Sequence, residues 1–165
     1  MPRMNSKHRR SLTAAVGVAV VGTVAAVALG SPGSGRVTTL LVAQADNNQI
    51  VHLNSDRIKF QTKDPTDVRV QTITFAPGGY SGWNHKPGFA IVAVQSGEVT
   101  KFDSQCNGTT YGPNSPNGAV FVEYGDEPEE VRNMSGASAT VYTTLVAPDA
   151  DPPVFRIEDD PPPCA

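Results

Sequence analysis

Residues 78–97, GGYSGWNHKPGFAIVAVQSG, decide the fold of this chain. Within this stretch residues 89–94 are apolar at every position, which predicts a strand buried on both faces in the middle of a core. Turn residues flank that run, with Lys86-Pro87-Gly88 before it and Ser96-Gly97 after it. The second turn predicts a hairpin with the next apolar run, 99–102.

Short apolar runs of the same kind recur along the chain and are separated by turn signals such as Gly112-Pro113. No amphipathic pattern of helical length appears after residue 30. Many short strands at regular spacing predict an all-β sandwich or barrel. The expected strands are 37–42, 50–53, 58–61, 68–75, 89–94, 99–102, 119–122 and 139–146.

Residues 78–97 resemble the first motif of the cupin family. That motif holds a glycine, two histidines, a glutamate and a second glycine, which fall here on Gly78, positions 84, 86 and 90, and Gly97. The second cupin motif ends in a histidine, three residues and an asparagine, which fall on position 129 and Asn133. The resemblance implies one cupin-type jelly-roll barrel over residues 31–147.

The four positions that hold a metal ion in usual cupins carry Asn84, Lys86, Ala90 and Glu129. Every imidazole is missing, and a lysine ammonium repels a divalent cation. We therefore expect no metal and no other cofactor, and a non-enzymatic binding or structural module. If the chain binds a small molecule, the expected place is the barrel mouth around Asn84, Lys86 and Glu129. An ion pair between Lys86 and Glu129, hydrogen-bonded to Asn84, would replace the metal.

The alternative is a cupin enzyme of the dioxygenase or isomerase type, with one divalent transition metal on His85 and Glu129. Strand side chains alternate, so His85 should face away from the interior that Asn84 and Lys86 face. A metal on His85 would require a register shift or a bulge.

The N-terminal residues have the pattern of an export signal. Residues 1–10 contain four basic and no acidic side chains, and residues 12–29 are an uncharged, mainly apolar run. This pattern predicts a signal peptide or signal-anchor helix over residues 1–30. The rest of the chain would be extracytoplasmic, either secreted or anchored to the cytoplasmic membrane by residues 12–29. Whether the segment is cleaved stays open.

Two cysteines, Cys106 and Cys164, lie in the exported part, where oxidation is permitted. Their even number favours one disulfide over free thiols or an intermolecular bridge. The bond would fasten the Pro-rich tail, residues 148–165, back onto the barrel. The chain is similar in this respect to exported single-domain bacterial cupins, which have a Pro-rich tail ending near a cysteine.

The net charge is −3, and the part after residue 30 has nine Lys and Arg against sixteen Asp and Glu. An acidic surface disfavours nucleic acid as a partner. Five acids lie within residues 123–130, and most of them are expected to be solvated. A third reading is a protein-interaction module that presents this acidic segment to a basic partner. Cupins also pair through their sheets, so the resemblance allows a homodimer.

Overall fold

The computed structural model describes residues 33–34 and 37–165, which form twelve β-strands and no helix. The predicted N-terminal helix and the export segment 1–30 lie outside the described residues. Within the described part, no helix is long and apolar enough to cross a membrane. The expectation of an all-β domain is confirmed for the residues that the structure describes.

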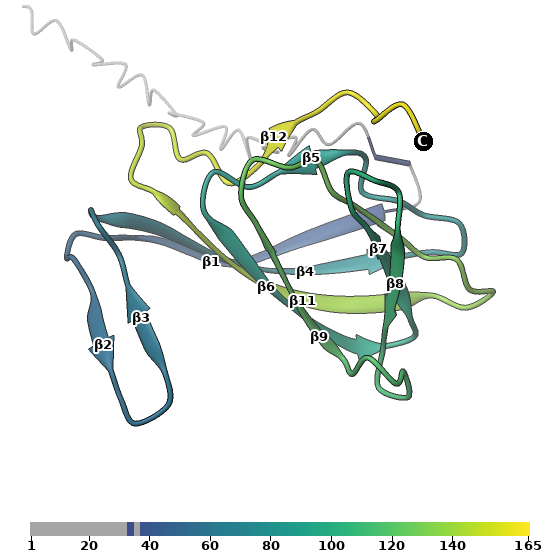
Figure 1. Cartoon of the computed structure of the whole chain (residues 1–165), viewed down its shortest axis with the longest axis horizontal. Coiled ribbons are helices and arrows are strands. Elements are labelled where there is room, and N and C mark those ends of the chain that lie inside the picture. The colour runs from purple at the N-terminus through teal and green to yellow at the C-terminus, as the bar shows by residue number, and fades with distance from the viewer. Residues whose placement is uncertain (1–32, 35–36) are drawn as a thin grey trace, which may run out of the picture.

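The main sheet contains five antiparallel strands (Figure 1). In spatial order they are β1 (Val37–Asn47), β4 (Thr66–Phe75), β11 (Ala139–Pro148), β6 (Phe89–Ser96) and β9 (Val120–Tyr124). A second sheet faces it, made of β10 (Glu130–Arg132), β7 (Val99–Phe102) and β8 (Gly108–Tyr111). The short strand β5 (Asn84–His85) extends the second sheet, because Asn84 pairs with Glu129 beside β10.

From β4 to β11 the chain crosses repeatedly between these two sheets, which is the topology of a double-sheet jelly roll. The predicted jelly roll is therefore confirmed. All eight strands expected from the sequence are present. The sequence analysis missed β5, β8, β10 and β12 (Ile157–Glu158), each of four residues or fewer.

The predicted hairpin at Ser96-Gly97 is wrong. The chain does turn there, but β6 belongs to the main sheet and β7 to the second. Gly97 has a φ of 71°, and a Cβ at this position would lie 2.6 Å from the Ser138 carbonyl oxygen. The turn needs glycine for both reasons.

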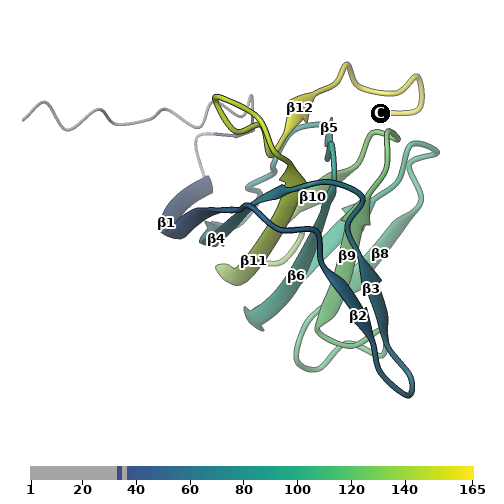
Figure 2. The same ribbon diagram turned by 90° about the vertical axis from the view of Figure 1, so that its left-hand side faces the viewer.

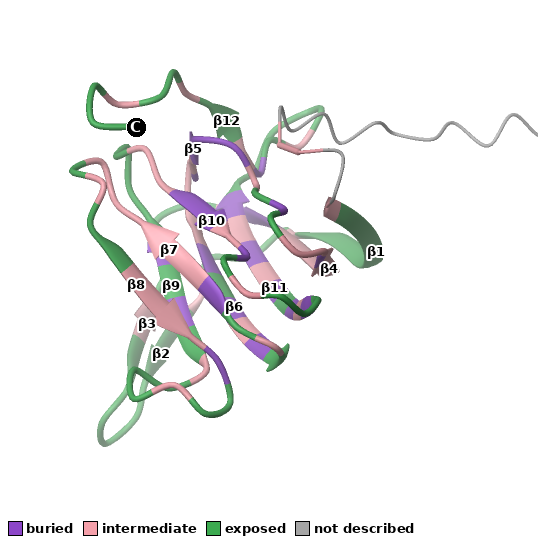
Figure 3. Ribbon diagram, turned by 90° about the vertical axis from the view of Figure 1, so that its right-hand side faces the viewer, coloured by how far each residue is buried: buried purple, intermediate pink, exposed green. Residues whose placement is uncertain are grey.

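β6 is buried on one face, not on two. Ala90, Val92 and Val94 point inward and are buried, whereas Ile91 is 44% exposed on the outer face. Figure 3 shows β6 with buried and exposed positions along its length. In a two-layer fold only the inner face of each sheet is covered by the other sheet, so an apolar run does not by itself establish burial on both faces. The core lies between the sheets and includes Phe75.

The C-terminal tail packs back on the barrel. β12 pairs with β5, and the side chain of Phe155 is buried within the core cluster. The predicted disulfide between Cys106 and Cys164 is confirmed, and it links the end of the tail to the loop between β7 and β8.

A hairpin of β2 (His52–Asn54) and β3 (Lys59–Gln61) projects away from the barrel (Figures 1 and 2). Near its base the end of β1 carries Asp46, which lies opposite Asp67 of β4. Asp67 is fully buried, and its Oδ2 accepts a hydrogen bond of 3.1 Å from the Ala150 amide. A hydrogen bond with Asp67 raises the pKa of Asp46, and burial and nearby aspartate charges add to the rise.

We expect Asp46→Asn to stabilise the protein at neutral pH. A raised pKa means that the fold favours protonated Asp46, so this contribution is present in acid and is lost as the pH rises through the folded-state pKa. The gain from the amide should therefore vanish on acidification. The gain in stability is measured at each pH by urea denaturation, monitored through the fluorescence of Trp83, the only tryptophan.

The matched control is Asp56→Asn, in the exposed turn of the β2–β3 hairpin, where the pair with Arg57 is solvated. It should leave the denaturation midpoint unchanged at every pH. A loss of stability in Asp46→Asn at pH 7 would contradict the prediction.

Candidate ligand-binding site

A cavity of about 420 Å³ lies between the main sheet and the tail. Its wall follows from strand alternation, because every second residue of each main-sheet strand points inward. β4 contributes Arg69, Gln71 and Ile73, and β11 contributes Thr143 and Leu145. The remaining lining residues are Val37, Thr39, Phe75, Ser81, Asn84, Lys86, Ala90, Val92, Glu123, Val131, Val141, Pro153, Val154, Phe155, Arg156 and Glu158.

Asn84 and Lys86 both line this cavity, as the sequence predicted for one face of the chain at β5. The Lys86 ammonium donates a hydrogen bond to Asn84 Oδ1 and lies 3.4 Å from Glu123 Oε2. The side chains of Lys86 and Glu123 are 9% and 8% exposed. This is a buried ion pair at the edge of a mainly apolar cavity.

The expected ion pair between Lys86 and Glu129 is wrong. The Glu129 carboxylate lies 2.5 Å from Lys101 Nζ, and Glu129 does not line the cavity. Glu123 replaces it because β9 pairs with β6 in a register that places Glu123 beside Ala90 on the inner face. Asn84 and Glu129 still meet, through backbone hydrogen bonds of 3.0 and 2.9 Å.

Burial raises the pKa of Glu129, and the hydrogen bond and charge of Lys101 oppose this rise. The segment 123–130 is therefore not a uniformly solvated acidic loop. Glu123 and Glu130 are buried, and Asp126 and Glu127 are exposed.

His85 faces away from the cavity, in agreement with the alternation along β5. Its Nδ1 lies 2.9 Å from both carboxylate oxygens of Asp159 in the tail. His85 and Glu129 are thus engaged by different partners, Asp159 and Lys101. Among the described residues no three His, Cys, Asp or Glu side chains form a group that could hold a metal ion. Lys86 stands at a position where usual cupins have a metal-binding histidine. The side chains at the four motif positions therefore do not fit the divalent metal ion of usual cupins.

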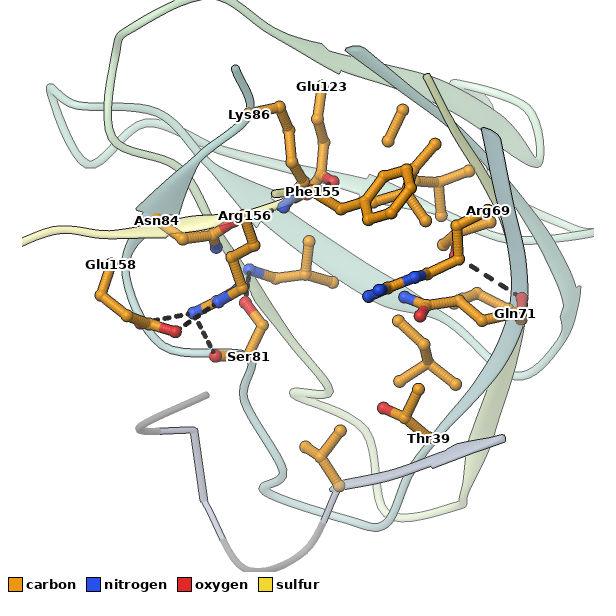
Figure 4. Close-up of a pocket in the computed structure, with 18 of the residues that line it drawn as sticks. Thr39, Arg69, Gln71, Ser81, Asn84, Lys86, Glu123, Phe155, Arg156 and Glu158 are labelled. Atoms are coloured by element: carbon orange, nitrogen blue, oxygen red, sulfur yellow. Dashed lines mark hydrogen bonds and ion pairs between the residues drawn. The ribbon is translucent and has the colours of Figure 1, made fainter. Parts of the chain in front are cut away.

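Sequence reasoning missed Arg69 and Gln71. Both lie on the inner face of β4, and Figure 4 shows their side chains entering the cavity from one side. Lys86 and Glu123 stand on the opposite side. A period of two along β4 places Arg69 and Gln71 on the same face as Phe75, but the sequence alone does not show that this face is the inner one.

No protein-family model matches the chain, and no curated protein sequence matches it significantly. Similar solved structures include a cupin superfamily protein from Desulfitobacterium hafniense, with 14% identity, a TM-score of 0.45, and coverage of 68% of this chain and 79% of that one. A conserved protein of unknown function from Streptococcus pyogenes has 16% identity, a TM-score of 0.43, and coverage of 62% and 78%. An oxalate oxidase has 21% identity and a TM-score of 0.38, covering 47% of this chain and only 40% of that enzyme.

Cupin superfamily proteins are thus among the structural neighbours of this chain. The similarities are too low to carry an argument about what it binds or does. That argument has to come from the cavity and its side chains.

Proposed function

We propose that this chain is an extracytoplasmic binding module of the cupin type that holds a small organic molecule in its barrel without catalysing a reaction on it. The observation that supports the proposal is the cavity itself. A volume of about 420 Å³, walled mainly by apolar side chains with a few polar groups, is within the range of small-molecule sites.

The residues at the family's metal positions support a binding role over metal chemistry. Lys86 takes the position of a metal ligand in the motif, and its ammonium already donates to Asn84 and pairs with Glu123. The basic N-terminal flank and the apolar run 12–29 support export, and the disulfide suits an oxidising compartment. Metal analysis of the purified full chain, never exposed to chelator, should find no stoichiometric transition metal.

Filling the cavity tests the binding role directly. Hexan-1-ol should raise the melting temperature of the full chain in a concentration-dependent way, because a ligand of the folded state stabilises it. Thr143→Trp, which places a large ring in the cavity, should abolish this rise. Differential scanning calorimetry measures both.

The matched control is Tyr142→Trp, one residue earlier on the outer face of β11, where the side chain is 44% exposed. It should keep the full response to hexan-1-ol. If the alcohol has no effect on the wild type, or acts equally on Thr143→Trp, the cavity is not a binding site.

A further inference from the structure

Three cationic side chains line the cavity, and two of them already have carboxylate partners. Lys86 pairs with Glu123. Arg156 lies 2.6 and 2.9 Å from the carboxylate oxygens of Glu158. Within the part of the chain that the structure describes, Arg69 forms no ion pair with any carboxylate.

The guanidinium of Arg69 is held in place but not neutralised. Its Nε donates a 2.9 Å hydrogen bond to the amide oxygen of Gln44, and its Cζ lies 4.1 Å from the centre of the Phe155 ring. These contacts use one N–H and one face, and they leave the terminal nitrogens for the cavity. Burial lowers the pKa of Arg69 because the charged group has lost part of its hydration. An anion beside it would offset that loss.

Gln71 lies two residues further along the same face of β4 and also has a polar atom without a partner within the described part of the chain. Its Oε1 is buried and accepts no hydrogen bond from the described residues. Figure 4 shows the side chains of Gln71 and Arg69 both reaching into the cavity. A buried acceptor without a donor is costly, so a ligand that donates a hydrogen bond here would be favoured.

We propose that the cavity binds an apolar carboxylic acid with a hydroxyl group next to the carboxylate. The carboxylate would accept paired hydrogen bonds from Arg69, the hydroxyl would donate to Gln71, and the hydrocarbon part would lie against Ile73, Val141 and Leu145. This inference rests on the proposed function, since it names the ligand class of the same cavity.

Three probes with the same carbon chain separate the contributions of the hydrocarbon chain, the carboxylate and the hydroxyl group to the affinity. They are hexan-1-ol, hexanoate and 2-hydroxyhexanoate. Affinities for the full chain are measured by calorimetric titration. The wild type should bind hexanoate about tenfold or more tightly than hexan-1-ol, because hydrogen bonds to a charged group are strong. 2-Hydroxyhexanoate should bind a further few-fold more tightly, through one neutral hydrogen bond.

Each variant should remove one preference and leave the others. Arg69→Met keeps an unbranched apolar stem and should lose the preference for hexanoate over hexan-1-ol, while continued binding of hexan-1-ol shows that the cavity is still present. Gln71→Met should lose only the gain from the hydroxyl. Arg57→Met, in the exposed turn of the β2–β3 hairpin and outside the cavity lining, is the arginine control and should keep both preferences.

The other outcomes are distinct. Equal binding of acid and alcohol by the wild type would overturn the anion site and leave the proposed function standing. A preference for the acid that survives Arg69→Met but is lost in the double variant Lys86→Met/Glu123→Met would place the anion at Lys86 and overturn the assignment to Arg69. Binding of none of the three probes would contradict the proposed function itself.

Discussion

Replacing both Cys106 and Cys164 by serine is expected to lower the free energy of unfolding by about 4 kcal/mol. The disulfide spans 58 residues of sequence, and a crosslink of that span removes much of the conformational entropy of the unfolded chain. The tail depends on the bond as well, because the rest of its attachment is the two-residue strand β12, Phe155 and a few side-chain contacts. Equilibrium urea denaturation of wild type and double variant measures the difference.

Reduction provides the control for this prediction. Dithiothreitol should lower the denaturation midpoint of the wild type to that of the double serine variant, and it should leave the variant unchanged. Equal midpoints for oxidised wild type and variant would show that the bond does not constrain the unfolded chain.

Replacing Lys86 alone by methionine is expected to cost about 3–5 kcal/mol, because it leaves the Glu123 carboxylate buried without its counter-ion. The Asn84 amide oxygen loses its donor in the same step. Thermal and urea denaturation should both show the loss.

The double variant Lys86→Met/Glu123→Met should be close to wild type in stability, because apolar side chains of similar volume replace both charges. Its stability completes a double-mutant cycle with the two single variants. Lys101→Met, which removes the partner of the more exposed Glu129, is the matched comparison and should cost less than Lys86→Met. Additive costs of Lys86→Met and Glu123→Met would contradict a coupled pair.

The all-β architecture was predictable because turn residues and alternating apolar runs are local signals. The partner of Lys86 was not. Strand alternation indicates that Lys86 points inward, but which acid meets it depends on the register between β6 and β9, a non-local property. Glu123 also lies at the start of an acidic segment, where solvation is the usual reading.

The role of Arg69 and Gln71 was hidden for a related reason. β4 has apolar residues on both faces, such as Val70 on one and Phe75 on the other, so its sequence does not say which face is inside. The covering of Arg69 by Phe155 comes from the tail, 86 positions later in the chain. A contact of that separation leaves no pattern in either segment alone.

The position of β11 determines when the barrel can be completed. β4 and β6 each pair with β11 and not with each other. The two halves of the main sheet therefore cannot join until residues 139–148, which form β11, have been synthesised. Until then β4 can pair only with β1, and β6 only with β9, so each of these two strands keeps one unpaired edge. Completion of the main sheet has to wait for β11, and pairing over such distances in sequence is intrinsically slow.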